Sequence, residues 1–450
     1  MSTDITRMES IVSLAKRRGF IFPTAEKYGG LGGFWDWGAL GVEFKNNIKQ
    51  AWWKKFVQGR RDVVGLDSAI VTNPTVWEKS GHLKGFTDSL IECKKCHKRY
   101  KADDLHPPGK AGRSCPNCDS MEFSDERAFN TMFKTFVGPV EDSASIAYLR
   151  PETAQNIFVN FESVQTSSRL KLPFGIAQIG KAFRNEITPG NFIFRSREFE
   201  QMELEYFVKP GEDSKWFEYW VEEAYQWFIG LGIKKEHLRK HPQSKGELAH
   251  YAKATVDLEY RWPFSTSGGD EGWSELIGVA NRGDFDLKAH GFSVKDETGE
   301  FVPYVIEPSF GVERPALAFL LDSYDVVKGG RTTTTESNKE EEIVLRLHKS
   351  LAPVKVAVLP LSKKEPLVKE AGKIFEEIAS RFACAYDDTA SIGRRYRRQD
   401  EIGTPYCLTV DFETLEDKKV TIRDRDTMEQ ERVAVEELTI YLTEKFNAFS

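Results

Sequence analysis

Apolar residues recur at helical spacing in two N-terminal segments. The first stripe ends before Gly19 and consists of Ile5, Met8, Val12 and Ala15. The second runs at four-residue steps through an aromatic segment and consists of Leu40, Phe44, Ile48, Trp52 and Phe56. Both spacings are typical of amphipathic helices. The second stripe suits the core of one chain and the interface between two chains equally well.

A strand pattern dominates residues 174–207, and a shorter apolar run at 63–71 predicts another strand. Residues 188–191 interrupt the longer pattern with Thr-Pro-Gly-Asn, which is typical of a hairpin loop, so the flanking runs predict two antiparallel strands. Side chains alternate between the two faces of a strand, so alternate residues share a face. We expect three such groups: Arg184 with Glu186, Arg195 with Arg197 and Phe199, and Gln201 with Glu203.

A sheet face that gathers charged and aromatic side chains is poor core, but it suits a nucleotide. Arginine forks match phosphate oxygens, an aromatic ring stacks on a base, and carboxylates hold an ammonium group or a metal ion. The alternative is an edge hairpin whose charges face water. Charged residues elsewhere in the chain favour the nucleotide interpretation.

Those charged residues interrupt or follow apolar strand patterns. Glu152 comes directly after one predicted strand, while Glu275 and Arg282 lie inside another. Charged residues in such runs are seldom buried without a partner or a function. Arg314 follows a further strand at the predicted start of a helix, where it can reach an anion.

The pattern divides the chain into a large and a small domain. The large domain covers residues 1–325, with a polar insertion at about 78–136 and a second insertion, rich in aromatic residues, at about 209–245. Residues 326–350 contain few apolar side chains and predict a linker. Alternating strand and helix patterns over residues 351–450 predict a small α/β domain.

Composition excludes some classes of protein. The chain has 450 residues and a net charge of -6, so any binding of nucleic acid must come from local basic patches. No apolar run approaches the roughly 18 residues that a membrane span needs. The N-terminus has no apolar signal region. We therefore expect no membrane partner and a cytoplasmic location.

Four of the six cysteines form two CxxC pairs with eighteen residues between them; they are Cys93, Cys96, Cys115 and Cys118. Each pair can present two thiolates to one tetrahedral ion, and this spacing is typical of a structural zinc ribbon, here at residues 91–120. A redox-active pair is the alternative. Because a four-thiolate site is closed, we expect the zinc ion to be structural rather than catalytic.

Six motifs together resemble the homodimeric class II glycyl-tRNA synthetases over nearly the whole chain. In order they are GVEFKNN from Gly41, RPETAQ from Arg150, FRNEITPGNFIFRSREFEQMELEYF from Phe183, GWSELIGVANRGDFDL from Gly272, EPSFGVER from Glu307 and SIGRRYRRQDEIGTP from Ser391. The resemblance implies an α+β class II catalytic domain with an antiparallel sheet and flanking helices, followed by an α/β anticodon-binding domain. It also implies a homodimer that activates glycine with ATP and transfers it to the 3′ end of tRNA(Gly). A non-catalytic, nucleic-acid-binding accessory subunit is the alternative.

The resemblance further implies which residues form the site, with Arg184, Glu186 and Arg314 acting at the phosphates and Mg²⁺ accompanying ATP. The ATP site comprises Arg184, Asn185, Glu186, Phe194, Arg195, Ser196, Arg197, Glu198, Phe199, Glu275, Leu276, Gly311, Val312, Glu313 and Arg314. The glycine site comprises Arg99, Glu152, Phe199, Glu200, Gln201, Met202, Glu203, Arg282, Glu307, Pro308, Ser309, Phe310 and Gly311, with Lys101 as the alternative to Arg99. The clustered glutamates suit an ammonium group, and their mutual repulsion should raise at least one pKa.

Arginines near the C-terminus predict contact with tRNA. Around Tyr396 stand Arg394, Arg395, Arg397 and Arg398. Dense arginine beside an aromatic ring suits phosphates and unstacked bases. Residues 420–426 add alternating charges that can read base edges. The chain departs from the family at Ala39, where proline is usual and helps to shape the dimer interface.

Overall fold

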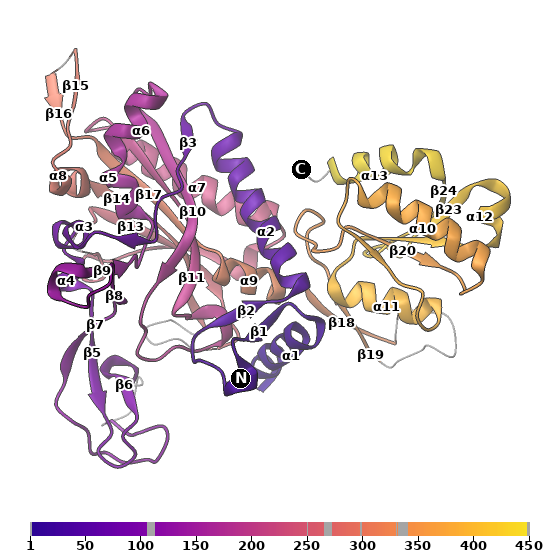
Figure 1. Ribbon diagram of the computed structural model, residues 1–450, viewed down its shortest axis with the longest axis horizontal. Coiled ribbons are helices and arrows are strands. Elements are labelled where there is room, and N and C mark those ends of the chain that lie inside the picture. Colours follow the sequence, from indigo (N-terminus) through magenta and orange to yellow (C-terminus); the bar gives the residue numbers. More distant parts are fainter. Residues whose placement is uncertain are drawn as a thin grey trace.

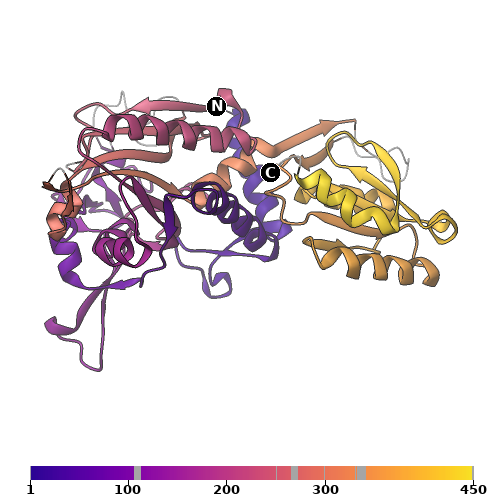
Figure 2. The ribbon, with the colours of Figure 1, turned by 90° about the horizontal axis from the view of Figure 1, so that it is seen from above.

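The computed structural model describes residues 2–105, 113–249, 251–264, 272–297, 299–329, 331 and 341–447. Figure 1 shows a large body built on a twisted sheet and a smaller C-terminal body beside it. The two bodies still lie side by side in Figure 2, which views the chain from above. Among the described residues, no helix combines the length and the apolar character that crossing a membrane requires.

A seven-stranded sheet forms the centre of the large body. Its strand order is β12-β13-β14-β17-β11-β10-β3, and every neighbouring pair is antiparallel except β10 and β3. The strands are β3 (Val63–Gly65), β10 (Phe174–Phe183), β11 (Glu198–Val208), β12 (Leu238–Pro242), β13 (Ala254–Arg261), β14 (Trp273–Gly283) and β17 (Tyr304–Gly311). The predicted antiparallel sheet is therefore confirmed.

The second apolar stripe packs on this sheet. It lies on α2 (Ala39–Trp53), which continues as a short π-helix, Lys54–Gln58. Its buried members are Phe44, Ile48, Trp52 and Phe56. The rings of Trp52 and Phe56 lie 5.9 and 5.6 Å from the ring of Phe310 in β17, so the stripe belongs to the core of its own chain.

The aromatic helix expected on a second insertion also packs on the sheet. α7 (Asp213–Gly230) lies against β14 and β17, and β12 extends the sheet itself. Trp220 and Phe228 are fully buried there. The sheet thus supplies the partner for the aromatic face of α7, and residues 209–245 pack as part of the large body.

The hairpin at residues 174–207 has the predicted pairing but a longer loop. β10 and β11 are antiparallel and end with Phe183 opposite Glu198. The intervening residues 184–197 form a loop with a 3-10 turn, Phe192–Phe194. Hydrogen bonds hold this loop, because the Arg197 guanidinium donates to the carbonyl oxygens of Glu186 and Gly32 at 2.7 Å each. Arg184, Glu186, Arg195 and Arg197 therefore lie in a loop, and strand alternation does not order them.

Shorter elements cover the edges of the large body. The run predicted as one strand at 63–71 is split between β3 and β4 (Val71–Thr72). Near the N-terminus are α1 (Ser2–Arg18), β1 (Ile21–Pro23) and β2 (Trp35–Trp37). The remaining elements are α5 (Ala154–Val159), α6 (Phe161–Ser168), α8 (Phe285–His290), β15 (Val294–Asp296), β16 (Gly299–Phe301) and α9 (Glu313–Ser323).

The polar insertion projects from the large body at the lower left of Figure 1. It begins with two short helices, and its central three strands have the order β6-β5-β7. Its elements are α3 (Pro74–Lys79), α4 (His82–Gly85), β5 (Thr87–Glu92), β6 (Arg99–Lys101), β7 (Arg127–Asn130) and β8 (Lys134–Phe136), the last of which pairs with β9 (Ile146–Leu149).

The C-terminal body has a five-stranded mixed sheet of order β21-β20-β22-β23-β24. Its strands are β20 (Val356–Pro360), β21 (Cys384–Tyr386), β22 (Tyr406–Val410), β23 (Lys419–Asp424) and β24 (Gln430–Ala434). Its helices are α10 (Glu365–Ala379), α11 (Ile392–Ile402), α12 (Phe412–Asp417) and α13 (Leu438–Asn447). The predicted linker contains part of a two-stranded ribbon, β18 (Tyr324–Lys328) with β19 (Glu341–Leu345), and its residues 332–340 lie outside the described part of the chain.

Candidate active site

A cleft of about 150 Å³ opens over β11, β14 and β17, between the 184–197 loop and the start of α9. Most of its lining belongs to the predicted ATP site. The lining residues are Arg184, Glu186, Ile193, Phe194, Arg195, Ser196, Phe199, Gln201, Glu275, Leu276, Ile277, Ser309, Gly311, Glu313 and Arg314. Of these, only Ile193 and Ile277 were not expected from the sequence.

Arg184 and Phe199 form one wall of the cleft. The guanidinium carbon of Arg184 lies 5.3 Å from the centroid of the Phe199 ring, and Nε donates to the carbonyl oxygen of Pro151 at 3.0 Å. That is the side chain's only hydrogen bond within the described residues, so the terminal nitrogens remain for a ligand. A guanidinium beside an aromatic ring in a cleft matches the phosphate and the base of a nucleotide.

Arg314 forms the opposite wall at the start of α9. Its guanidinium carbon lies 4.4 Å from the Phe194 ring centroid, and Nη1 donates to Glu275 Oε2 at 2.9 Å. The Glu275 side chain is half exposed, so this ion pair is weak and a phosphate can replace the carboxylate. The helix N-terminus adds a favourable potential for an anion.

Beneath the cleft lies an acidic nook, which we define as Glu152, Glu203 and Glu307. Glu203 is 2% exposed and connects the nook to the cleft. Its Oε1 accepts hydrogen bonds from Ser309 Oγ at 2.6 Å and Gln201 Nε2 at 2.8 Å. Its Oε2 accepts one from the Thr153 backbone at 2.9 Å. Strand alternation predicts this arrangement for Gln201 and Glu203, because both side chains point to the cleft face of β11.

Arg282 closes the nook from β14. Its Nη1 donates to Glu307 Oε2 at 2.8 Å, while Nε and Nη2 donate to the two oxygens of Asp286 at 2.6 and 2.8 Å. The Tyr251 ring lies 3.8 Å from the guanidinium. Asp286 also accepts from Gln155 at 2.8 Å. The predicted arginine is therefore in the pocket, held by a carboxylate that the sequence analysis did not single out.

The carboxyl groups of the nook do not ionise alike. Burial raises the pKa of Glu307 to about 8, although Arg282 opposes the shift. Burial and the charge of Glu152 raise the pKa of Glu203. Burial acts in the same direction on Glu152, but His82 and Arg282 outweigh it and the pKa falls. The expected rise of at least one pKa is confirmed.

Four predicted contacts lie on the opposite face of the sheet. They are Glu200, Met202, Pro308 and Phe310, which alternate with the cleft residues along β11 and β17. Glu200 pairs with Lys45 at 2.6 Å, and the same ammonium lies 3.1 Å from Glu313. Phe310 is in the aromatic core. The prediction took whole runs of residues, whereas a strand presents only every second side chain to a ligand.

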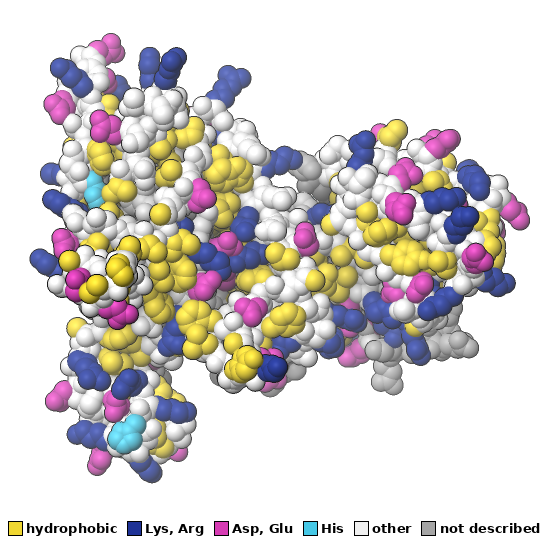
Figure 3. Space-filling view, in the orientation of Figure 1, with side chains coloured by type: hydrophobic (Ala, Val, Ile, Leu, Met, Phe, Trp, Pro, Cys, Tyr) yellow, Lys and Arg dark blue, Asp and Glu magenta, His cyan; other side chains and the backbone are white. Residues whose placement is uncertain are grey.

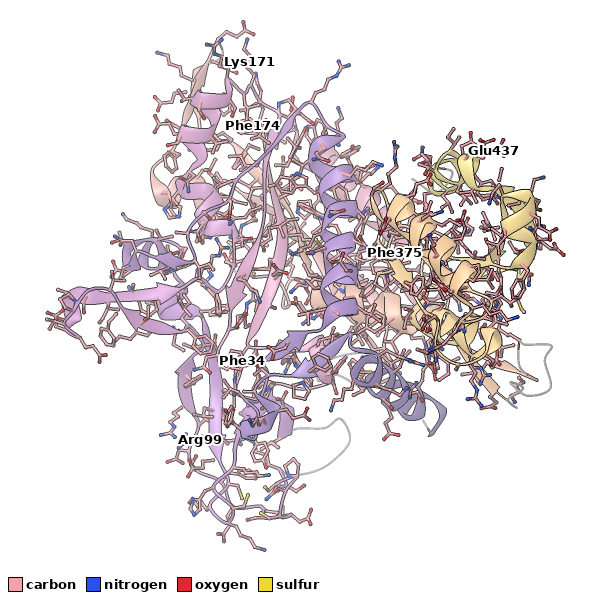
Figure 4. The ribbon with its side chains drawn as sticks, turned by 45° about the vertical axis from the view of Figure 1, so that its right-hand side comes forward. Phe34, Arg99, Lys171, Phe174, Phe375 and Glu437 are labelled. Carbon is pink, nitrogen blue, oxygen red and sulfur yellow. The ribbon has the colours of Figure 1, made fainter. Side chains whose placement is uncertain are left out.

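Five further predicted residues lie outside the lining of the cleft. Arg197 is bound to carbonyl oxygens of the loop, Glu198 pairs with Lys181 at 2.6 Å, and Val312 is core. Asn185 lies in the loop, where its backbone NH donates to the Thr131 carbonyl oxygen. Arg99 lies on the projecting insertion, paired with Glu92 at 3.0 Å (Figure 4). Its alternative, Lys101, pairs with Asp88 at 2.7 Å.

The four cysteines of the insertion meet as predicted. Their sulfur atoms all lie within 4.8 Å of one another, with Cys93 and Cys118 at 3.6 Å and Cys96 and Cys115 at 3.5 Å. Four thiolates about 2.3 Å from a tetrahedral zinc ion are separated by about 3.8 Å. The cluster therefore fits a structural zinc ion.

The C-terminal arginines mostly hold their own domain together. Arg395 is 2% exposed and donates to backbone carbonyl oxygens, including Ala390 at 2.8 Å. Arg398 pairs with Asp387, and Arg397 with Glu342 at 3.2 Å. The 420–426 segment behaves similarly, because Arg423 makes two 2.9 Å bonds to the buried Asp400. Of the four arginines predicted to meet tRNA, only Arg394 is exposed.

Figure 3 shows an apolar patch on the large body, with positive and negative side chains intermixed immediately to its right.

Sequence reasoning missed several polar residues of the nook. His82 lies 3.3 Å from Glu152, Thr153 binds Glu203, and Glu205 follows Glu203 on the same face of β11. The alternation that selected Glu203 applies equally to Glu205. His82 comes from the distant insertion, and no local pattern signals it.

Two family models match the chain. One described as "tRNA synthetase class II core domain (G, H, P, S and T)" matches residues 139–324, and one described as "Anticodon binding domain" matches residues 355–445. A solved prolyl-tRNA synthetase from Cryptosporidium parvum, complexed with halofuginone and AMPPNP, has the same fold with a TM-score of 0.64 at 16% identity, covering 98% of this chain and 77% of that one. Fold and cleft together define a class II aminoacyl-tRNA synthetase.

Curated relatives described as glycine–tRNA ligase include those of Alkaliphilus oremlandii, 53% identical with 99% of each chain covered, and Acetivibrio thermocellus, 52% identical with 98% of each covered. The chain belongs to the glycine–tRNA ligase family. A third such relative, from Thermobifida fusca, is 50% identical with 99% of each chain covered. The predicted family resemblance is confirmed.

Proposed function

We propose that this chain activates glycine with ATP to form glycyl-adenylate and pyrophosphate, and then transfers glycine to the 3′ end of tRNA(Gly). The observation that carries the proposal is the acidic nook directly beneath an arginine-lined cleft. Gln201 and Ser309 line the cleft and donate to Glu203 below it. An amino acid whose ammonium enters the nook therefore has its carboxylate at the nucleotide.

Glycine offers no side chain to recognise, so its two charged groups must be gripped. The nook residues Glu152, Glu203 and Glu307 suit the ammonium, and Arg282 and Ser309 are proposed to hold Glu307 and Glu203 in place for it. A pocket that glycine fills rejects a larger amino acid by steric clash. A pocket built for a larger amino acid, in contrast, loses only about 1 to 3 kcal/mol of binding free energy when the substrate lacks a methyl group. Selection of the smallest amino acid then needs no editing site.

Activation is an in-line displacement. A glycine carboxylate oxygen attacks the α-phosphorus of ATP, a new P–O bond forms, and the bond to the leaving pyrophosphate breaks. Arg184 and Arg314, on opposite walls, are the proposed cations for the phosphate oxygens, and Phe199 is the proposed base platform. Holding two reactants in line is worth roughly 7 to 11 kcal/mol, so no protein nucleophile is required.

Two metals belong to the proposal. Mg²⁺ would use oxygen ligands, and Glu186 and Glu275 are carboxylates that line the cleft. When bound, Mg²⁺ supplies positive charge that neutralises the phosphates. Zinc would bind the four cysteines and support the fold of the projecting insertion.

The remaining partners also stay proposals. Arg394 is the proposed contact of the C-terminal domain with tRNA, because it is the exposed member of its cluster.

We also propose a homodimer. Exposed apolar side chains beside Gly38 support it, namely Phe22 at 37% and Val42 at 41% exposure. They lie next to Ala39, where proline is usual in the family. We propose that the protein is located in the cytoplasm.

Aminoacylation tests the proposed function. Purified protein with ATP, Mg²⁺ and tRNA(Gly) transcript should attach labelled glycine to the tRNA, and transcripts for other amino acids should accept none. A chain that binds tRNA(Gly) without charging it, although Arg184, Glu186 and Arg314 are intact, would instead be an accessory subunit.

A further inference from the structure

Glu205 is a fourth carboxyl group at the inner end of the acidic nook. It is fully buried and lies two residues beyond Glu203 on the cleft face of β11. The β11–β17 register pairs Glu203 with Ser309 and Tyr206 with Ile306. Glu205 therefore stands across from Glu307, which is itself a member of the nook.

Neither oxygen of Glu205 has a hydrogen-bond partner within the described residues. The charged groups that act on it are Glu307, Arg282, Glu203 and Asp286. The one cation among them, Arg282, bonds to Asp286 and Glu307 instead. Within the described part of the chain Glu205 therefore has no ion pair, although an acidic neighbour lies opposite it.

A buried carboxylate without donors is far more costly than a buried carboxylic acid. Burial and the neighbouring Glu307 raise the pKa of Glu205 well above its ordinary value. The protonated form also carries an O–H group, which the ionised form lacks, and an acceptor lies across the strands. The lack of hydrogen-bond donors around Glu205 and the repulsion by Glu307 therefore both favour the neutral acid.

We propose that Glu205 remains a neutral carboxylic acid during glycine recognition and acts as a positioning residue, donating a hydrogen bond that orients the Glu307 carboxylate toward the ammonium group. This inference rests on the proposed function of the nook. It leaves Glu152, Glu203 and Glu307 as the only nook members that can carry negative charge toward the ammonium. It also explains how a fourth acidic group is tolerated at the bottom of the site.

Three variants distinguish a neutral Glu205 from an ionised Glu205 that binds the ammonium group of glycine directly. Glu205→Gln keeps the shape and a donor without a charge. Glu205→Leu has a similar volume and no donor. Glu203→Gln removes a proposed charged contact and serves as the comparison. The measured quantities are the KM values for glycine and for ATP in pyrophosphate exchange, with thermal unfolding to check that each variant folds.

We expect Glu205→Gln to keep the KM for glycine within about twofold, and Glu205→Leu to raise it at least about tenfold, as expected for one lost hydrogen bond to a charged group. The KM for ATP should change little in both. A rise in Glu205→Gln as large as that in Glu203→Gln would overturn the proposal, because Glu205 would then act as an anion. Normal glycine KM in Glu205→Leu would also overturn it.

Infrared spectroscopy provides a test that does not depend on activity. At neutral pH the wild-type protein should show carbonyl stretching bands of protonated carboxylic acids, and Glu205→Gln should lose one component of them, distinct from the component that Glu307→Gln removes. An unchanged spectrum would overturn the neutral acid even if the chain proved not to use glycine. Conversely, a wild-type chain without glycine-dependent exchange would refute the proposed function while this component still reports on Glu205.

Discussion

Arg282 Nη1 donates a 2.8 Å hydrogen bond to Glu307 Oε2, and both side chains are almost entirely buried. The pair joins β14 to β17 under the cleft. Arg282 also forms a buried ion pair with Asp286, and removing one partner of such a pair leaves the other charge uncompensated, which costs about 3 to 5 kcal/mol. We therefore expect Arg282→Leu to lose about that much unfolding free energy, measured by urea denaturation.

The matched control is an exposed pair on the same sheet. Lys181 and Glu198 are 2.6 Å apart, with side chains 38% and 36% exposed. Exposed pairs contribute about 0 to 1 kcal/mol, so Lys181→Ala should change stability by no more than that. Equal losses of unfolding free energy in the two variants would show that the buried hydrogen bonds of Arg282 do not stabilise the fold more than an exposed pair does.

The pKa of Glu307 predicts how stability depends on pH. Its value is about 8 in the folded protein, against about 4.3 for an unfolded glutamate. Between these values the folded state binds more protons, so this group stabilises the fold below about pH 4 and loses that contribution as pH rises to about 8. Glu307→Gln should remove the corresponding slope, up to about 1.4 kcal/mol per pH unit, in urea denaturation across this range. The same steep fall with pH in wild type and variant would contradict the assignment.

Arg184 is expected to act on the transition state of activation. Only Nε of Arg184 donates a hydrogen bond within the described residues, so its terminal nitrogens can bind a ligand. The terminal nitrogens of Arg197, in contrast, donate to the carbonyl oxygens of Gly32 and Glu186. Removing one preorganised donor typically costs 10²- to 10³-fold, so Arg184→Ala should lower kcat of pyrophosphate exchange by about that factor without loss of stability. Arg197→Ala should instead destabilise the loop. An Arg184→Ala enzyme with normal kcat would exclude this role.

Metal removal should affect the insertion and spare the central sheet. The four sulfurs lie within 4.8 Å of one another in the projecting insertion, whose strands β5, β6 and β7 form a sheet separate from the seven-stranded one. Structural zinc contributes folding free energy directly. We expect one zinc per chain by metal analysis, and faster amide exchange in β5–β7 after chelation while β11 and β17 keep their protection. Equal loss of protection in the sheet would contradict a local role.

Local pattern predicted much of the fold and of the site. The antiparallel pairing of β10 with β11, the helical stripe through Trp52 and the cysteine cluster follow from spacing alone. Alternation also placed Gln201 and Glu203 on one face. It was not applied to Glu200 and Met202, which alternate with them and point to the opposite face of the sheet.

Other features depend on contacts distant in sequence. The density of arginine at residues 394–398 gives no sign that Arg395 is buried, because its acceptors are carbonyl oxygens of a preceding loop. His82 reaches Glu152 from a separate insertion. The aromatic face of α7 required a partner, and only the assembled sheet identifies that partner as β14 and β17.

The central claim is that the acidic nook binds the ammonium of glycine while the cleft above it binds ATP. The most direct test measures both KM values in pyrophosphate exchange for wild type and Glu203→Gln. Loss of one charged contact should raise the KM for glycine at least about tenfold and leave the KM for ATP within about twofold. Equal rises in the two KM values, or an unchanged requirement for glycine, would contradict the account.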